Sequence, residues 1–345
     1  MSDITLSGLT NYVRTTQGYR ALVKGLLAIG DGDHRPLVHV SALETARPVL
    51  AAALQRDLKA PLLLLTAHPE RAHQLAQHLR AFARHPDDVY RFPPPDALPY
   101  ERVAWDIETR RQRLDTLCAL AQLPAAQTNG DAPDRWPLIV TSSRGLLTRT
   151  LPPVELSKAM LSLKRGQQLD LARLLERLSA MGYEMVSVVE APGAISHRGG
   201  IVDIYPTASA SPVRIEFFGD EIESLRAFDP ATQRSSEMIE AITITPAAEA
   251  LPGRGPAIED DLLALDLSTL HPLAQSAYTR EREALLAGVT LRNIEFYQGY
   301  LHPATATLLD YLPGDAWILI DDWQEVAIVG AEVGAQAETV RDSQV

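Results

Sequence analysis

The first half of the chain alternates short apolar runs with amphipathic stretches. Apolar runs occupy residues 37–40, 61–66 and 138–143. The first is followed by helix-compatible sequence to about Asp57, and the second by a stretch whose apolar residues recur every three to four positions as far as Phe82. Buried strands that alternate with helices predict a parallel sheet covered on both faces, and therefore an α/β domain.

The pattern changes after the Leu-Pro-Pro sequence at 151–153. The segment 169–181 has the apolar stripe of an amphipathic helix, and Gly182 is its expected stop. Turns then separate five β-like runs, which lie at residues 184–189, 200–205, 213–218, 221–228 and 238–245. One helix with several short strands predicts a smaller α+β domain with an antiparallel sheet.

The α+β domain is expected to interrupt the α/β domain. From about residue 251 the chain is again helical, and 317–320 reads as one more buried strand. The expected organisation is the first part of the α/β domain at 1–152, the α+β domain at 153–250, the completion of the α/β domain at 251–330 and a helical tail at 331–345. The tail looks cut short, which suggests a piece of a longer protein.

The loop after the first apolar run occupies the place where many α/β proteins bind a nucleotide phosphate. A phosphate loop needs the pattern G-x-x-x-x-G-K-[ST]. That frame places His39, Glu44, Thr45 and Ala46 at its four fixed positions, and none of them matches. Glu44 would add a carboxylate where an anion binds, so ATP hydrolysis by these residues is not expected.

The strand at 317–320 ends in Asp321 and Asp322, as the second half of a nucleotide site would. Taken alone, this is more simply a buried strand that meets solvent at two acids. Together with the loop, it is compatible with a nucleotide site that has degenerated.

Composition narrows the functional classes. The net charge of −12 gives no overall attraction for a phosphate backbone, so protein partners suit the chain better than DNA. The single cysteine, Cys118, excludes a disulfide framework and a cysteine-rich zinc site and fits a reducing cytoplasm. No apolar run approaches the about 18–20 residues that span a bilayer. We expect no cofactor, no metal and no membrane contact.

The run VRIEFF at 213–218 contains the main candidate site. Side chains alternate along a strand, so the odd-numbered residues are expected in the core and Arg214, Glu216 and Phe218 on the outer face. Arginine and aromatic residues are enriched in protein–protein interfaces. The alternative is that another element covers Phe218, or that the turn at 219–220 twists it inward.

Other polar residues give weaker signals. Arg198 precedes two glycines and either joins the patch or forms a surface ion pair with a carboxylate. Asp203 lies in a buried run with no obvious cationic or metal partner and is expected to accept backbone hydrogen bonds. His68, His73 and His78 are five residues apart, which on a helix points them in different directions.

The sequence APGAISHRGGIVDIYP, continued by PVRIEFFGDEIESLRAFDPATQRS, resembles the second domain of bacterial transcription-repair coupling factors (Mfd). It is similar, more distantly, to the matching domain of the excision-repair protein UvrB. The flanking sequences FPPPDALPYE and YLPGDAWILIDD also resemble the coupling factors. The resemblance implies a RecA/helicase-like parallel-sheet domain with a degenerate nucleotide site, interrupted by the smaller α+β domain.

Two departures from UvrB favour the coupling factors. UvrB has a working Walker loop at the position of 39–46, and it carries a DNA-wedging hairpin for which the few residues after Tyr100 leave no room. In the family, the second domain binds UvrA. The resemblance assigns this role to Arg198, Arg214 and Phe218.

The resemblance therefore implies a non-catalytic module that recruits UvrA to stalled transcription complexes. Contacts with RNA polymerase and DNA, and the ATP-dependent translocase motor, would reside in other regions of the full-length protein. Two alternatives stay open. One is a UvrB-like nucleotide-dependent repair enzyme, and the other is a structural domain that restrains a neighbouring motor.

Overall fold

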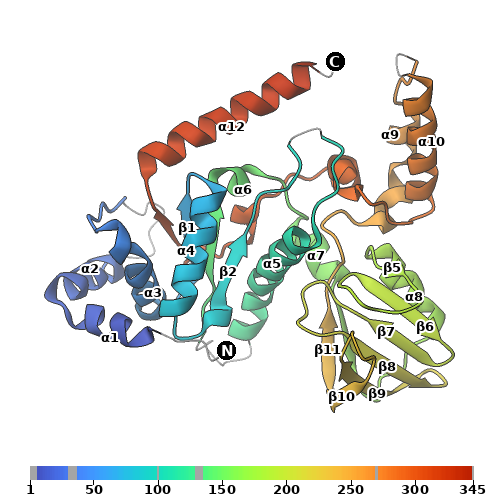
Figure 1. The fold of residues 1–345 in the computed structure, drawn as a ribbon, viewed down its shortest axis with the longest axis horizontal. Coiled ribbons are helices and arrows are strands. Elements are labelled where there is room, and N and C mark those ends of the chain that lie inside the picture. The colour runs from blue at the N-terminus through green and yellow to red at the C-terminus, as the bar shows by residue number, and fades with distance from the viewer. Residues whose placement is uncertain (1–5, 30–36, 99–100, 129–134, 269–270, 344–345) are drawn as a thin grey trace. The chain divides into compact units, whose positions relative to one another are not determined.

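The computed structural model describes residues 6–29, 37–98, 101–128, 135–268 and 271–343. The chain divides into two compact units (Figure 1). Unit 1 comprises Met1–Pro95, Ala119–Thr148 and Leu308–Val345, and unit 2 comprises Asp96–Cys118 and Arg149–Thr307. This division places 251–307 in unit 2. The expected domain boundaries at 152 and 250 stay a prediction.

Unit 1 contains one four-stranded sheet and the helices around it. Its strands are β1 (Leu62–Thr66), β2 (Val89–Phe92), β3 (Leu138–Ser142) and β12 (Trp317–Ile320). Its helices are α1 (Ser7–Thr15), α2 (Gln17–Leu27), α3 (Arg47–Leu58), α4 (Pro69–Phe82), α6 (Ser143–Leu147) and α12 (Trp323–Ser343), with short 3-10 turns η1 (Glu44–Ala46), η2 (Pro86–Asp88) and η5 (Leu308–Tyr311). Helix α5 (Ile107–Thr128) begins in unit 2 and ends in unit 1.

The sheet of unit 1 is parallel, in the order β12-β1-β3-β2. Strands β1 and β3 are buried along their whole length, as expected for a sheet covered on both faces. Helix α4 packs Leu75 and Leu79 into the core, as its predicted stripe requires. The predicted α/β architecture is therefore confirmed.

The prediction of a buried strand at 37–40 is wrong. These residues have irregular backbone and pair with no strand in the described part of the chain. Leu37 is 69% exposed and Val40 is 49% exposed. An apolar run becomes a buried strand only where a neighbouring strand and a covering layer are available, and apolarity alone does not reveal that.

Unit 2 contains the antiparallel strands and the remaining helices. Its strands are β4 (Leu161–Lys164), β5 (Glu184–Met185), β6 (Ala194–Arg198), β7 (Ile201–Ile204), β8 (Val213–Phe218), β9 (Glu221–Phe228), β10 (Ser235–Met238) and β11 (Ala241–Ile244). Its helices are α7 (Pro153–Ala159), α8 (Leu171–Ala180), α9 (Glu259–Leu263), α10 (Pro272–Leu286) and α11 (Gln298–Leu301), with 3-10 turns η3 (Pro252–Ile258) and η4 (Ile294–Tyr297).

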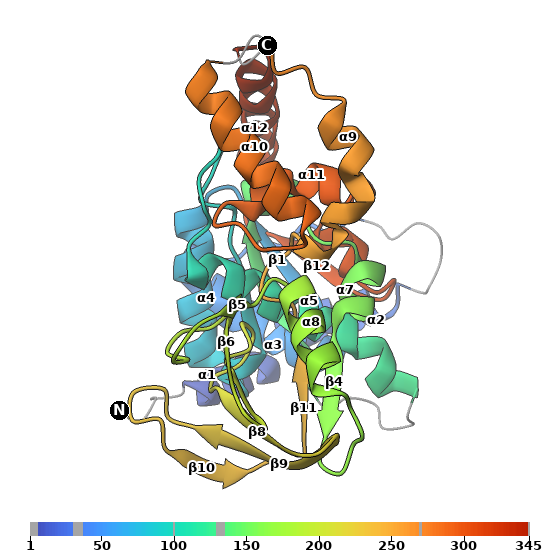
Figure 2. The same ribbon diagram turned by 90° about the vertical axis from the view of Figure 1, so that its right-hand side faces the viewer.

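Strands β5 to β10 form a six-stranded sheet in the order β10-β9-β8-β7-β6-β5, and β4 and β11 form a separate pair (Figure 2). All neighbours in the larger sheet are antiparallel except β5 and β6. One face of this sheet packs against α8 through a core that includes Leu174, Leu178, Val202, Ile215 and Leu225. The predicted α+β domain with an antiparallel sheet is confirmed.

The ends of helix α8 follow from its sequence. The Asp170 side chain accepts a hydrogen bond from the backbone N–H of Arg173 at 2.8 Å, which caps the first turn. Gly182 adopts φ +92°, and the N–H of Tyr183 reaches the carbonyl of Leu178 at 3.1 Å. A left-handed glycine followed by this bond closes the helix at the predicted stop.

Arginines of helix α5 are tied to distant parts of unit 2. Arg113 pairs with Glu249, both are almost fully buried, and the guanidinium lies 5.0 Å from the ring centre of Trp105. Arg110 donates to Glu295 at 2.8 Å. Buried charges need such partners, so these pairs fix the beginning of α5 against residues 249 and 295.

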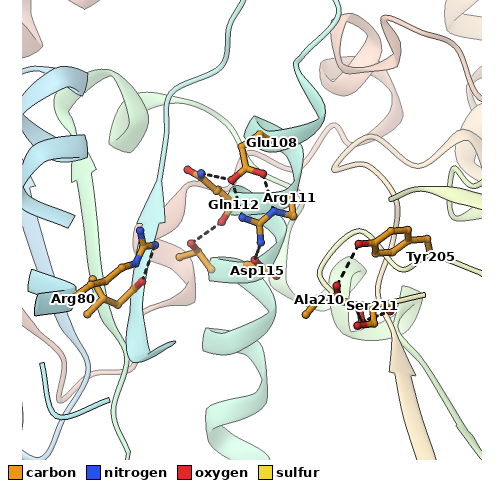
Figure 3. Close-up of polar contacts among 11 residues, drawn as sticks. Arg80, Glu108, Arg111, Gln112, Asp115, Tyr205, Ala210 and Ser211 are labelled. Carbon is orange, nitrogen blue, oxygen red and sulfur yellow. Dashed lines mark hydrogen bonds and ion pairs between the residues drawn. The ribbon is translucent and has the colours of Figure 1, made fainter. Parts of the chain in front are cut away.

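A second set of polar contacts runs along α5 (Figure 3). Arg111 pairs with Glu108 at 2.7 Å and with Asp115 at 3.1 Å, and Gln112 also donates to Glu108. Burial raises the pKa of Asp115 to about 6, although the nearby Arg111 favours the charged form. Burial likewise raises the pKa of the Cys118 thiol to about 12, so this cysteine is not a reactive thiolate.

Asp115 makes the stability of the folded state depend on pH. The pKa of Asp115 is higher in the folded chain than in the unfolded chain. Between about pH 4 and pH 6, the folded state therefore keeps the proton on Asp115, whereas the unfolded state has released it. Stability is therefore lost as pH rises through this window. We expect Asp115→Asn to stabilise the protein at pH 7.5 by on the order of 2 kcal/mol and much less at pH 4.5. Urea unfolding at both pH values measures this, and equal effects at both would contradict it.

Candidate protein-docking site

The candidate site lies at one end of the six-stranded sheet, where two β-hairpins turn. Strands β6 and β7 are joined at Gly199–Gly200, and β8 and β9 are joined at Gly219–Asp220. Because consecutive strands are antiparallel, both turns emerge at the same end of the sheet. The two turns therefore place Arg198, which ends β6, and Phe218, which ends β8, at the same end of the sheet.

Glycine is required where the first turn meets β8. A Cβ atom on Gly200 would lie 2.8 Å from the carbonyl oxygen of Phe217, and Gly199 has φ +60°. The N–H of Phe217 donates to the carbonyl of Gly200 at 2.7 Å. The turn thus lies directly against the end of β8 and fixes the backbone that carries Phe218.

Phe218 points away from the core. Its side chain is 80% exposed, whereas the neighbouring Phe217 packs against the core of unit 2. Neither another described element nor the turn at 219–220 covers the Phe218 ring. A fully exposed phenylalanine at a fixed position costs free energy in water and gains it when an apolar pocket of a partner encloses it.

Arg214 is held by a buried carboxylate. Its Nε and Nη2 atoms donate to the two oxygens of Asp203 at 2.7 and 2.8 Å, and its guanidinium lies 5.1 Å from the ring centre of Phe228. The hydrogen bonds to Asp203 raise the pKa of Arg214 further. The side chain of Arg214 is 18% exposed, so it reaches the surface in a fixed orientation.

The expectation that Asp203 accepts backbone hydrogen bonds and lacks a cationic partner is wrong. Asp203 on β7 is directly opposite Arg214 on β8, and directly opposed residues share a face. The carboxylate is 1% exposed and also lies 3.6 Å from Nη2 of Arg198. The alternation along β7 places Asp203 on one face of the sheet, and that along β8 places Arg214 on one face. Only the register between the two strands shows that these side chains are directly opposite.

Arg198 is the more exposed cation of the site. Its side chain is 62% exposed, and its contact with Asp203 is longer than the two hydrogen bonds of Arg214. Asp203 thus balances one of the two positive charges. An exposed cation and an exposed aromatic ring at the same end of a sheet can bind a carboxylate and an apolar pocket of one protein surface. This arrangement favours binding a protein surface over catalysing a reaction.

The loop that was compared with a phosphate loop lies in unit 1. His39 is exposed in the irregular segment before η1, and η1 itself consists of Glu44, Thr45 and Ala46. Helix α3 begins directly after it at Arg47.

Two arginines form ion pairs with the carboxylate of Asp321, which directly follows β12. Arg47 donates to Asp321 Oδ1 at 2.8 Å, and Arg71 contacts Asp321 Oδ2 at 3.0 Å and Glu44 at 2.8 Å. The Asp321 side chain is only 8% exposed. It therefore does not meet solvent at the end of the strand. A cavity of about 760 Å³ borders Arg47 and Asp321, but leucine, valine, isoleucine and alanine side chains form most of its wall.

Within the described residues, no three His, Cys, Asp or Glu side chains are grouped as a metal site would require. No helix in the described ranges is both long and apolar enough to cross a membrane.

Comparison with known proteins identifies the family to which this chain belongs. Residues 161–249 match the family described as the UvrB interaction domain. The transcription-repair-coupling factor of Bacillus subtilis is 30% identical over 328 residues, which cover 92% of this chain and 26% of that protein. Those of Mycobacterium bovis (31% over 339 residues; 96% and 26%) and Myxococcus xanthus (35% over 211 residues; 60% and 17%) are also similar.

Unit 2 thus contains a UvrB interaction domain, and the candidate docking site lies inside the matched residues. The chain is an N-terminal, UvrB-like module of the transcription-repair coupling factor (Mfd) family. It spans about a quarter of the length of the B. subtilis and M. bovis relatives.

The buried ion pair makes a specific prediction for stability. Asp203→Asn keeps the shape of the side chain but leaves Arg214 and Arg198 without their shared counter-ion. We expect a loss of about 3 kcal/mol in the free energy of unfolding, measured by urea denaturation. The control is Asp220→Asn, which changes an exposed turn residue and is expected to cost less than about 0.5 kcal/mol. Equal stabilities of the two variants would contradict the assignment.

Proposed function

We propose that this chain is a non-catalytic recruitment module that binds UvrA through the Phe218 end of the six-stranded sheet and so links stalled transcription to nucleotide excision repair. The observation that carries the proposal is Phe218, whose ring is 80% exposed inside the UvrB interaction domain. Contacts with RNA polymerase and DNA, and the translocase motor, are assigned to other regions of the full-length protein.

Each proposed docking residue has a distinct role. Phe218 inserts into an apolar pocket of UvrA, and Arg198 pairs with a carboxylate at the pocket rim. Arg214 contributes its remaining donors while Asp203 keeps it in place. A side chain that is held rigid before binding loses little conformational entropy in the complex, so Arg214 is suited to be a hot spot. Phe218 is suited to be one because its exposed ring offers a large apolar surface.

Replacement of the aromatic ring tests the proposal directly. We expect Phe218→Ala to weaken binding of purified UvrA by about 2 kcal/mol or more, roughly 30-fold, in isothermal titration calorimetry. The matched control is Leu273→Ala on α10, which removes an apolar side chain that is 76% exposed but lies outside the matched domain. Equal affinities of the Phe218 and Leu273 variants would refute the site.

The non-catalytic part of the proposal rests on unit 1. None of the four positions of the phosphate-loop frame carries the required residue, and Arg47 and Arg71 neutralise Asp321 internally. We expect no ATP binding by calorimetry at millimolar nucleotide. Micromolar binding that is lost in Asp321→Ala would instead support a nucleotide-dependent enzyme.

A further inference from the structure

Arg226 lies on the same face of the sheet as the docking residues. It sits on β9 directly opposite Arg214 on β8, and directly opposed residues of antiparallel strands share a face. On its other side, Arg226 is opposite Met238 on the edge strand β10. The register therefore places Arg214, Arg226 and Met238 in one row across three strands.

The charge of Arg226 is not balanced within the described residues. Its side chain is half-buried and forms no hydrogen bond or ion pair there. The nearest acids on this face are committed elsewhere, because Asp203 binds Arg214 and Glu216 accepts a hydrogen bond from Ser224. Like charges directly opposite one another destabilise a sheet, so an unpaired Arg226 beside Arg214 has a cost that an external carboxylate would remove.

Exposed apolar side chains accompany the cations. Met238 is 47% exposed, and Ile201, which is opposite Glu216 on β7, is 38% exposed. Methionine, arginine and aromatic residues are the types that interface cores favour. The face thus has the composition of a docking surface beyond Arg198, Arg214 and Phe218.

We propose that the docking surface continues across β9 to β10, where Arg226 pairs with a carboxylate of the partner protein and Met238 packs against an apolar side chain next to it. This inference rests on the proposed function and adds two residues and an acidic counterpart to it. A protein carboxylate fits better than a nucleic-acid phosphate, because the chain carries a net charge of −12 and this face also exposes apolar side chains.

The test measures UvrA binding by calorimetry at two salt concentrations. Arg226→Gln removes the charge without placing an acid opposite Arg214. We expect it to weaken binding about 10-fold at low salt and to reduce the salt dependence of the affinity. We expect Met238→Ala to weaken binding several-fold. The control Arg173→Gln removes an exposed arginine of α8, which packs on the other face of the sheet, and should leave affinity within about 2-fold.

The outcomes separate this inference from the proposed function. If Phe218→Ala weakens binding but Arg226→Gln behaves like Arg173→Gln, the extended surface is refuted while the UvrA site stands. If the unmodified chain does not bind UvrA, the proposed function fails and this inference fails with it. If duplex DNA binds and Arg226→Gln abolishes that binding, the assignment of a carboxylate partner is overturned. Unchanged thermal unfolding of Arg226→Gln shows that lost affinity is not lost fold.

Discussion

The candidate docking face depends on one buried carboxylate. Asp203 has almost no contact with solvent, yet it satisfies two donors of Arg214 and lies near Arg198. An arginine on an open sheet would otherwise sample many rotamers, and its ordering would reduce the affinity for a partner. The ion pair with Asp203 and the contact with the Phe228 ring already order the Arg214 side chain in the folded protein, so its conformational entropy is lost before binding. The Gly199–Gly200 turn likewise supports the backbone at the end of β8, where the N–H of Phe217 donates to the carbonyl of Gly200.

Both units contain a carboxylate that is shared by two arginines. In unit 1, Asp321 is held between Arg47 and Arg71, and Arg71 also reaches Glu44, so both arginines have carboxylate partners within the unit. In unit 2, the carboxylate leaves Arg198 largely exposed. In each unit a nearly buried carboxylate is shared by two arginines whose side chains are partly or largely exposed.

Periodicity in the sequence was sufficient for much of the fold and for part of the site. The stripes of α4 and α8 and the alternation along β8 depend on neighbours that are close in sequence, and they gave these elements and the outward direction of Phe218. The expected strand at 37–40 was wrong and β6 was missed, because strand formation depends on a partner elsewhere in the chain. The role of Asp203 required the register between β7 and β8, which no single run of residues contains.

The order of the strands has a consequence for synthesis. Strand β12 pairs with β1, although about 250 residues separate them in the chain. The six-stranded sheet, by contrast, is built from the continuous stretch 184–238 and is complete before the ribosome reaches Trp317. Because domains fold as they emerge, a polypeptide interrupted in between would already carry the candidate docking site. Its leucine-rich β1 would meanwhile remain an unprotected edge, ready to pair with another nascent molecule.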